Sequence, residues 1–162
     1  MLYNNVDRLT EAQAIQLHAL YQREWWTAGR TLEDVRAMLA GSDHLYGICD
    51  GETAQLAGFA RVLTDGVFKA LVFDVIVESA HRGQQIGRKL MERVLSDPRL
   101  ARVKHFELYC LPELEPFYEV LGFSDDVGGV RLMRYAASRN DRNDPLSVKR
   151  RRSSSAPPDT TK

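Results

Sequence analysis

The residues best suited to chemistry lie near the middle of the chain, where an apolar run at 72–77 leads through a polar loop into a helical pattern at 86–95. The first amides of a helix have no partners within the helix, and the helix dipole makes that end positive, so it binds phosphate groups well. Two glycines beside this helix start, Gly83 and Gly87, let the backbone approach a ligand closely. Two arginines, Arg82 and Arg88, add positive charge. The segment therefore predicts a pyrophosphate site, with an ordinary strand-to-helix turn as the alternative.

The elements that must position this loop follow from apolar periodicity and turn signals. Apolar runs predict six strands, at 2–6, 44–49, 55–63, 68–77, 103–110 and 130–135. Apolar residues at helical spacing predict four helices, which begin near residues 10, 31, 86 and 112. The order β-α-α-β-β-β-α-β-α-β indicates a mixed α/β fold, and Asp-Gly turns between the central strands predict a largely antiparallel sheet.

Two of the expected helices carry their own start signals. Thr10 is followed three residues later by Gln13, and Thr31 is followed by Asp34, which is the capping-box arrangement. Gly41 stops the second of these helices. These signals place the starts of the first two helices.

Size and composition predict one globular domain. The chain has 162 residues, of which 44% are hydrophobic and 27% charged, as is typical of soluble proteins. No apolar run approaches ~20 residues and the first residues do not resemble a signal peptide, so we expect a cytoplasmic protein with no membrane span. Cys49 and Cys110 lie in apolar stretches, which predicts buried free thiols. No His or Cys spacing indicates a metal site, so we expect no metal.

Residues 136–162 differ in composition from the rest of the chain. They contain seven Lys or Arg and three Asp, so their net charge is +4, and the remainder carries −4 because the total is zero. Few of them are apolar, which predicts a disordered basic tail after a domain at 1–135. The run 149–152 leaves a nuclear-localisation or RNA-binding patch as an alternative. No aromatic residue stands near it for base stacking, and we expect no nucleic-acid partner.

The central loop resembles the cofactor motif of the GNAT superfamily of N-acetyltransferases, Gln/Arg-x-x-Gly-x-Gly/Ala between a strand and a helix. Arg82 and Gly87 match its first and last positions, whereas Gln85 stands where the family usually has glycine. The resemblance implies a GNAT-like fold over about residues 1–135, acetyl-CoA as co-substrate, and a splayed strand whose free backbone pairs with the pantetheine arm. The residues it implies for cofactor binding are Val75, Ile76, Val77, Arg82, Gly83, Gln84, Gln85, Ile86, Gly87 and Arg88.

A second match lies downstream. The strand-like run 107–110 and the segment 116–123 resemble the family's fifth strand and its Phe-Tyr-x-x-x-Gly-Phe helix end. In relatives with this pattern the tyrosine faces the sulfur of coenzyme A, which implies that Tyr118 protonates the departing thiolate. A phenol is a hydrogen-bond donor near neutral pH. The alternative is an aromatic side chain that only packs at a helix end.

The group that takes the proton from the amine is less clearly marked. Some relatives carry a glutamate high on the fourth strand, but the aligned position here is Leu71. Asp74 is the nearest carboxylate and our first candidate, with the alternative that it only orders the backbone of the strand and loop. The other candidates are Glu24, Glu107, His44 and a chain of water molecules. For the oxyanion, the resemblance implies a backbone amide near Val75 or Ile76.

The acceptor should be selected by the connection between the first two helices, which covers the site in this family. The connection reads Glu-Trp-Trp-Thr-Ala-Gly-Arg over residues 24–30, and two adjacent tryptophans cannot both face one core stripe. We therefore expect Trp25, Trp26 and Arg30 to bind the acceptor. An aromatic lining suits a compact small-molecule amine. Packing of one of the tryptophans in the core is the alternative for that residue.

These features together predict an acyltransferase that moves the acetyl group of acetyl-CoA to a primary amine, by direct attack in a ternary complex. The missing carboxylate at Leu71 leaves a second class open, a non-catalytic sensor that binds acyl-CoA. A protein amine as the acceptor, an interaction module acting through the basic tail, and a homodimer also remain open.

Overall fold

The computed structural model describes residues 2–135. By its contacts the chain divides into two units, Met1–Val130 and Arg131–Lys162. The helices and strands of the described residues all lie in the first unit. The tail expected at 136–162 lies outside the described residues, so its disorder and the domain boundary at 135 stay predictions.

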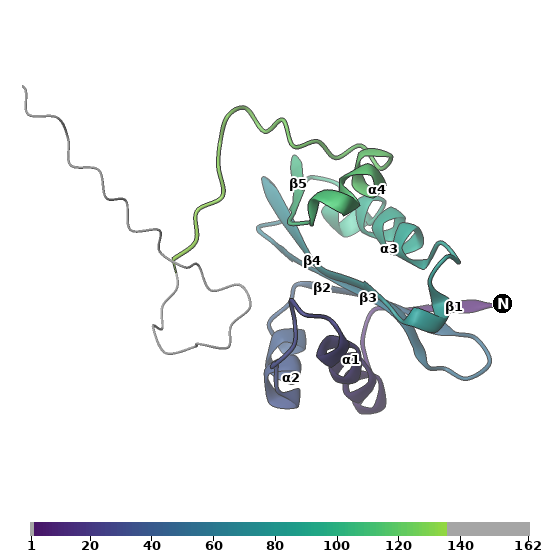
Figure 1. The fold of residues 1–162 in the computed structure, drawn as a ribbon. Helices are drawn as coiled ribbons and strands as arrows, with labels where there is room; N and C mark the ends of the chain where they lie inside the picture. The colour runs from purple at the N-terminus through teal and green to yellow at the C-terminus, as the bar shows by residue number, and fades with distance from the viewer. Residues whose placement is uncertain (1, 136–162) are drawn as a thin grey trace, which may run out of the picture. The chain divides into compact units, whose positions relative to one another are not determined.

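A five-stranded sheet forms the centre of the first unit (Figure 1). Its strands lie in chain order and pair antiparallel, except that β4 and β5 pair parallel. The strands are β1 (Tyr3–Val6), β2 (His44–Asp50), β3 (Leu56–Thr64), β4 (Lys69–Val77) and β5 (His105–Leu108). The predicted mixed α/β fold with a largely antiparallel sheet is confirmed.

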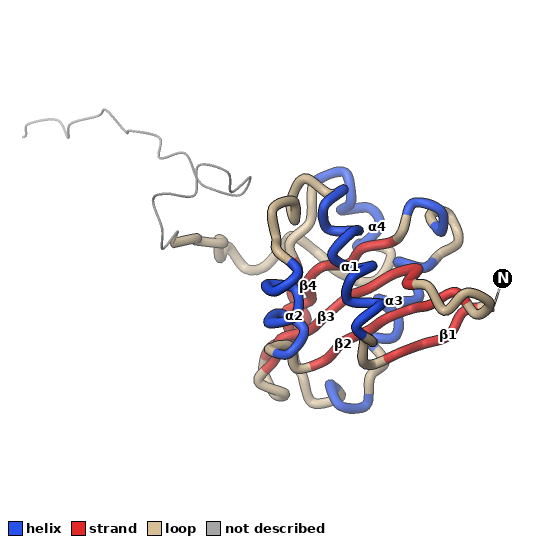
Figure 2. Tube along the Cα trace, turned by 90° about the horizontal axis from the view of Figure 1, so that it is seen from below, coloured by secondary structure: helices blue, strands red, loops and turns tan. Residues whose placement is uncertain are grey.

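Helices cover both faces of this sheet. The helices are α1 (Glu11–Arg23), α2 (Leu32–Ala40), α3 (Ile86–Leu95) and α4 (Glu115–Glu119). Figure 1 shows α1 and α2 on one face and α3 and α4 on the other, and in Figure 2, seen from below, α1 and α2 cross in front of the strands. Three single-turn 3-10 helices join the elements: η1 (Ser79–His81), η2 (Pro98–Leu100) and η3 (Pro112–Leu114).

Each face of the sheet has its own apolar cluster. Buried residues of α1 and α2 pack against Phe59 and Ile76 on one face. Buried residues of α3 pack against Ile48 and Val72 on the other. Full burial of a Leu, Ile or Phe side chain contributes about 1.5–3 kcal/mol. The two clusters therefore fix the end of β4 and the start of α3, and the loop predicted to bind a pyrophosphate lies between these two elements.

The capping signals of the first two helices are confirmed. Oγ1 of Thr10 accepts from the amide of Gln13 at 3.2 Å, and Oγ1 of Thr31 accepts from the amide of Asp34 at 3.1 Å. Both capping boxes are complete, and Gly41 is the C-cap of α2. Helices α1 and α2 therefore begin where the sequence signals place them.

Two expectations for the later part of the chain are wrong in detail. The strand expected at 103–110 is confined to β5, so Cys110 lies in a loop and is exposed, while Cys49 is buried as expected. Residues 130–135 form no strand, although four of the six are apolar. Within the described residues no strand pairs with them, and an apolar run yields a strand only where a neighbour supplies the hydrogen-bonded ladder.

Candidate active site

The loop between η1 and α3 turns through two left-handed residues. Gly83 and Gln85 have φ angles of 77° and 62°, a conformation that glycine adopts freely and glutamine only at a cost. Gln85 is the N-cap of α3 but makes no side-chain capping hydrogen bond. The first amides of α3 therefore stay open to a ligand, and the helix dipole favours an anion there.

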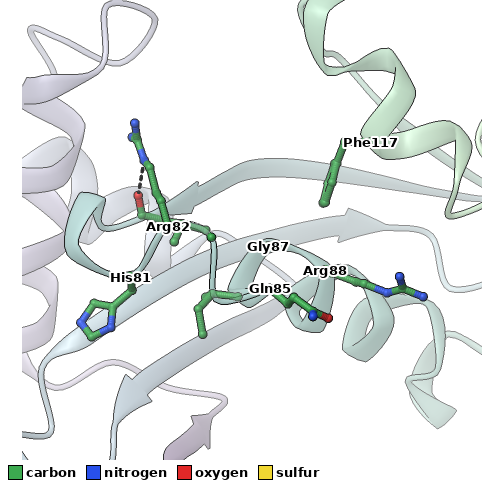
Figure 3. Close-up of a pocket in the computed structure, with 9 residues that line it drawn as sticks. His81, Arg82, Gln85, Gly87, Arg88 and Phe117 are labelled. Carbon is green, nitrogen blue, oxygen red and sulfur yellow. Dashed lines mark hydrogen bonds between the residues drawn. The ribbon is translucent and has the colours of Figure 1, made fainter. Parts of the chain in front are cut away.

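A groove of about 440 Å³ lies over this helix start (Figure 3). Its lining consists of Val77, His81, Arg82, Gly83, Gln85, Ile86, Gly87, Arg88 and Phe117. A methyl group on Gly87 would stand 3.5 Å from Cζ of Phe117, so this glycine keeps the groove open between α3 and the ring of Phe117. The structure thus brings seven of the ten predicted cofactor residues to one groove, and their contact with acetyl-CoA stays a prediction.

Arg82 is held loosely at the rim of the groove. Its Nε donates to the carbonyl of Val77 at 3.3 Å, the contact drawn as a dashed line in Figure 3, and its Nη2 donates to Glu24 at 2.6 Å. The Arg82 side chain is 59% exposed, and an exposed ion pair contributes little stability. The guanidinium can therefore leave Glu24 for a phosphate at small cost.

Strand β1 holds the opposite side of the loop. The hydroxyl of Tyr3 lies 3.0 Å from Nδ1 of His81 and donates to the side chain of Gln84 at 2.6 Å. Gln84, predicted to bind the cofactor, is thus engaged with β1 rather than lining the groove. The roles of Tyr3 and His81 were missed from the sequence, because no local signal connects the first strand with a loop so far along the chain.

Strand β4 runs beyond its parallel neighbour at the edge of this groove. The last β4–β5 pair is Val72 with Leu108, whereas β4 continues to Val77. Within the described residues, 73–77 have no strand partner on the β5 side. An extended chain of amide groups can pair with such an edge as an added strand. This geometry agrees with the splayed strand that the family resemblance implied.

A bulge interrupts β4 just past this point of divergence. One residue of β3, Ala60, lies opposite two of β4, Asp74 and Val75, and Asp74 has a φ of 55°. The extra residue reverses the side-chain alternation, since Val72 and Val75 both pack towards α3 while Ile76 packs towards α1. The bulge therefore sets the orientation of the strand segment that borders the groove.

The carboxylate of Asp74 accepts from three side chains. Arg61 donates through Nε at 2.6 Å, Arg30 through both terminal nitrogens at 3.1 and 3.2 Å, and the hydroxyl of Tyr21 at 3.1 Å. The Asp74 side chain is only 3% exposed. Burial, followed by the charge of Asp74, raises the pKa of Tyr21, which keeps that hydroxyl a donor. Both carboxylate oxygens of Asp74 accept hydrogen bonds from these groups, so this arrangement favours the alternative that Asp74 orders the strand over the role of general base.

Of the other side chains predicted as bases, two form ion pairs and one has a buried nitrogen without a hydrogen-bond partner among the described residues. Glu24 pairs with Arg82, and Glu107 pairs with Lys69. His44 has its Nδ1 buried without a hydrogen-bond partner among the described residues. The part of the chain that the structure describes therefore singles out no side chain as the base, which favours a chain of water molecules.

Tyr118 lies next to Phe117, whose side chain lines the groove. It is 7% exposed, and its ring packs edge-on against Phe117 and Phe123, with centroids 4.9 and 5.9 Å away. Burial, and then the charge of Cys110, raises the pKa of Tyr118 to about 12. The hydroxyl therefore stays protonated at neutral pH and can donate a hydrogen bond.

The residues predicted to bind the acceptor have different surroundings. Trp25 is 51% exposed, whereas Trp26 packs against the apolar cluster below the sheet. Arg30 points to Asp74, and its guanidinium lies over the ring of Tyr21, 4.7 Å from the centroid. Of the three, Trp25 is the side chain left open for contact with a ligand.

Comparison with known proteins identifies the family. A family model described as an acetyltransferase (GNAT) domain matches residues 41–125. Serotonin N-acetyltransferase 2, chloroplastic, of Oryza sativa subsp. japonica is 43% identical over 81 residues, 50% of this chain and 40% of that protein. GCN5-related N-acetyltransferase 1, chloroplastic, of Arabidopsis thaliana is 31% identical over 114 residues, 70% of this chain and 57% of that protein. The chain thus matches only about half the length of these curated relatives.

Solved structures show the same fold. A putative acetyltransferase of the GNAT family from Xanthomonas campestris pv. campestris superposes with a TM-score of 0.74 at 23% identity, covering 84% of this chain and 94% of that one. Glucosamine-6-phosphate N-acetyltransferase from Arabidopsis thaliana gives 0.66 at 20% identity, with 83% and 99% covered. The chain therefore belongs to the GNAT family of acetyltransferases. The resemblance and the acyltransferase class predicted from the sequence are confirmed at the level of the family.

Proposed function

We propose that this chain transfers the acetyl group of acetyl-CoA to the primary amine of a small molecule, by direct attack in a ternary complex. The observation that carries the proposal is the groove over the start of α3, which lies beside the free edge of β4. Open helix amides with Arg82 and Arg88 suit a pyrophosphate. The free edge of β4 suits the pantetheine arm, which is the extended, amide-containing chain that follows the pyrophosphate in coenzyme A.

A hydrogen-bond donor at the departing sulfur speeds the transfer. The amine lone pair attacks the thioester carbon, the carbon–sulfur bond breaks, and the sulfur leaves with the electron pair. The pKa of Tyr118, about 12, lies well above that of a thiol, ~8.5. Full proton transfer to the thiolate is therefore uphill, and Tyr118 contributes as a hydrogen-bond donor that stabilises the sulfur while it becomes negative.

The remaining steps fall to backbone and water. A backbone amide near Val75 or Ile76 is the proposed donor to the oxyanion, because these residues follow the bulge on the free edge of β4. The proton of the amine passes to water, since Asp74 and Glu107 are held in ion pairs. Glu24, which Arg82 leaves when it turns to the phosphate, is the remaining side-chain candidate. Leu71 in place of a carboxylate fits the same route.

A small amine is the first candidate for the acceptor. The exposed ring of Trp25 offers an aromatic surface for a compact cation, and the relative from Oryza sativa is named a serotonin N-acetyltransferase. A protein amine is the second candidate, because Histone acetyltransferase TAP1 of Glycine max is 30% identical over 82 residues.

Turnover with an amine panel tests the proposal. Acetyl-CoA is mixed with small aromatic and aliphatic amines and with a lysine peptide, while thiol release and the mass of each acceptor are followed. We expect acetylation of at least one small amine at a higher kcat/KM than of the peptide. Preference for the peptide would support the second candidate. If acetyl-CoA raises the thermal midpoint but no amine is acetylated, the non-catalytic sensor is favoured.

The location in the cell also stays a proposal. Within residues 2–135 no helix is both long and apolar enough to cross a membrane. Two of the curated relatives are named as chloroplastic proteins, whereas the sequence led us to expect the cytoplasm. Imaging of the tagged chain in its own cells would decide between the cytoplasm and a membrane-bounded compartment.

A further inference from the structure

The left-handed residue of β4 needs support from its surroundings. Asp74 has a φ of 55° within a strand, which costs a residue other than glycine about 1–2 kcal/mol. It lies two residues past the last β4–β5 pair, Val72 with Leu108. Backbone conformations of this kind persist only where the surrounding structure holds them.

Three donors from three different elements provide that support. Tyr21 comes from α1, Arg30 from the α1–α2 connection and Arg61 from β3. Stacking fixes both guanidiniums further, since Arg30 lies over the ring of Tyr21 and Arg61 over the ring of Phe73, each at 4.7 Å. A buried carboxylate without partners would be strongly unfavourable. The Asp74 side chain is therefore confined to the one position that all three donors reach.

The bulge decides how the rest of β4 faces the groove. Removal of one residue from a strand sends every later side chain to the other face of the sheet. Val75 and Val77 pack on the α3 side because of the bulge, and Val77 lines the groove. Backbone amides and carbonyls alternate with the same period. The bulge thus also sets which amides of 75–77 point to the free edge.

We propose that Asp74 is a positioning residue for acetyl transfer. Its clamp by Tyr21, Arg30 and Arg61 holds the bulge that orients the backbone of residues 75–77 beside the groove. Asp74 acts through the backbone and takes no proton from the amine. Arg30 connects the segment expected to cover the acceptor with the strand that borders the cofactor groove. As a role in catalysis, this inference rests on the proposed function.

Substitutions at residue 74 separate the backbone conformation from the side chain. Asp74→Gly removes the clamp, but glycine adopts the left-handed φ without penalty. Asp74→Ala removes the clamp and disfavours that φ. Since loss of one oxyanion donor lowers kcat by about 10²–10³, we expect about a hundredfold fall for Asp74→Ala and at most about a tenfold fall for Asp74→Gly. Equal losses of kcat in both variants, with loss of the acidic limb of the pH profile, would instead make Asp74 the base and overturn the inference.

A binding measurement keeps the test independent of turnover. The dissociation constant of acetyl-CoA, measured by calorimetry, should rise about tenfold or more in Asp74→Ala and less than about threefold in Asp74→Gly. This holds even if the chain proves to be a sensor without activity. Equal affinity in both variants and the wild type would contradict the inference, whatever the turnover shows.

Two further variants complete the test. One is a control for a left-handed residue elsewhere in the chain, and the other is a substitute in case Asp74→Ala does not fold. Ala54 is also left-handed, with a φ of 57°, but lies in the turn between β2 and β3, so Ala54→Gly should leave kcat and the dissociation constant unchanged. If Asp74→Ala does not fold, Arg30→Ala replaces it, because this arginine is partly exposed. We expect Arg30→Ala to lower kcat several-fold with the acceptor KM within about twofold. A rise in the acceptor KM alone would assign Arg30 to the acceptor and overturn the clamp.

Discussion

The hydroxyl of Tyr3 on β1 lies 3.0 Å from Nδ1 of His81, which lines the cofactor groove 78 residues further along the chain. The same hydroxyl donates to Gln84. The first strand of the sheet therefore fixes one side of the loop that leads into α3. A loop held in place before a ligand arrives loses less entropy when it binds.

Tyr3→Phe removes both hydrogen bonds and keeps the ring, over which Lys89 lies at 5.3 Å. A hydrogen bond contributes about 0.5–1.5 kcal/mol net, so the dissociation constant of acetyl-CoA should rise about three- to tenfold. We expect kcat at saturating acetyl-CoA to stay within about twofold. Calorimetry and steady-state kinetics measure the two quantities. An unchanged dissociation constant would show that the loop is held without β1.

Gln85→Gly should stabilise the protein. Gln85 has a φ of 62°, a conformation that costs about 1–2 kcal/mol for residues other than glycine. A gain of ~1 kcal/mol corresponds to roughly 2–4 °C in the thermal midpoint of a chain this long. Gly83, with a φ of 77°, provides the opposite test, because Gly83→Ala should lower the midpoint. A lower midpoint for Gln85→Gly would mean that the glutamine side chain makes a contribution larger than the strain.

The groove over the start of α3 could be predicted from the sequence because its determinants are local, whereas its binding of acetyl-CoA stays a proposal. The open amides, the arginines and the glycines of the α3 start lie within residues 82–88, and all are visible as residue types in one short segment. The capping boxes of α1 and α2 are local in the same sense. A signal contained in one turn of chain depends little on how distant elements pack.

The clamp around Asp74 could not be predicted, for the complementary reason. Its donors Tyr21, Arg30 and Arg61 are far apart in sequence, and each alone resembles an ordinary core tyrosine or surface arginine. A left-handed φ at an aspartate leaves no mark in the sequence. The strand expected at 130–135 is also wrong, because a short run rich in apolar residues says nothing of whether a partner strand is present.

Tyr118→Phe tests the donor at the departing sulfur. The substitution keeps the ring between Phe117 and Phe123 and removes only the hydroxyl. Because a thiolate can leave without full protonation, we expect kcat to fall about ten- to a hundredfold, below the roughly hundred- to ten-thousandfold range that is usual for such groups. The dissociation constant of acetyl-CoA should change little. Normal turnover in a folded variant would leave Tyr118 with a packing role only.

The raised pKa of Tyr118 also predicts a pH dependence. With a pKa of about 12, the hydroxyl stays protonated, and able to donate, throughout pH 7 to 10. The ratio of wild-type kcat to Tyr118→Phe kcat should therefore stay constant over that interval. Unfolded tyrosine loses its proton near its ordinary pKa of 10, so this group lowers the free energy of unfolding as pH rises from about 10 to 12. A ratio that collapses between pH 8 and 9 would contradict the assigned pKa.

The two tryptophans should differ when each is replaced by alanine. Trp25 is exposed, so Trp25→Ala should raise the acceptor KM with little change in the KM for acetyl-CoA or in the thermal midpoint. Trp26 packs against the α1–α2 cluster, and Trp26→Ala should lower the midpoint by several degrees through lost packing. Loss of stability in Trp25→Ala without any change in the acceptor KM would remove this residue from the acceptor site.

We propose that Arg82, Arg88 and the open amides of α3 hold the pyrophosphate of acetyl-CoA. Both arginines are in exposed ion pairs, with Glu24 and Glu92, which they can leave at little cost. Charge-assisted hydrogen bonds contribute about 1.5–3 kcal/mol each, so their joint loss should weaken binding by at least about a hundredfold. Arg102 is exposed and lies outside the groove lining, which makes Arg102→Ala a matched control.

The most direct test is calorimetric titration of the wild type, the Arg82→Ala/Arg88→Ala double variant and Arg102→Ala, each with acetyl-CoA and with S-acetylpantetheine, which lacks the pyrophosphate. Only the double variant should lose affinity for acetyl-CoA, by at least about a hundredfold, and all three proteins should bind S-acetylpantetheine alike. Full affinity of the folded double variant for acetyl-CoA would contradict the assignment of this groove.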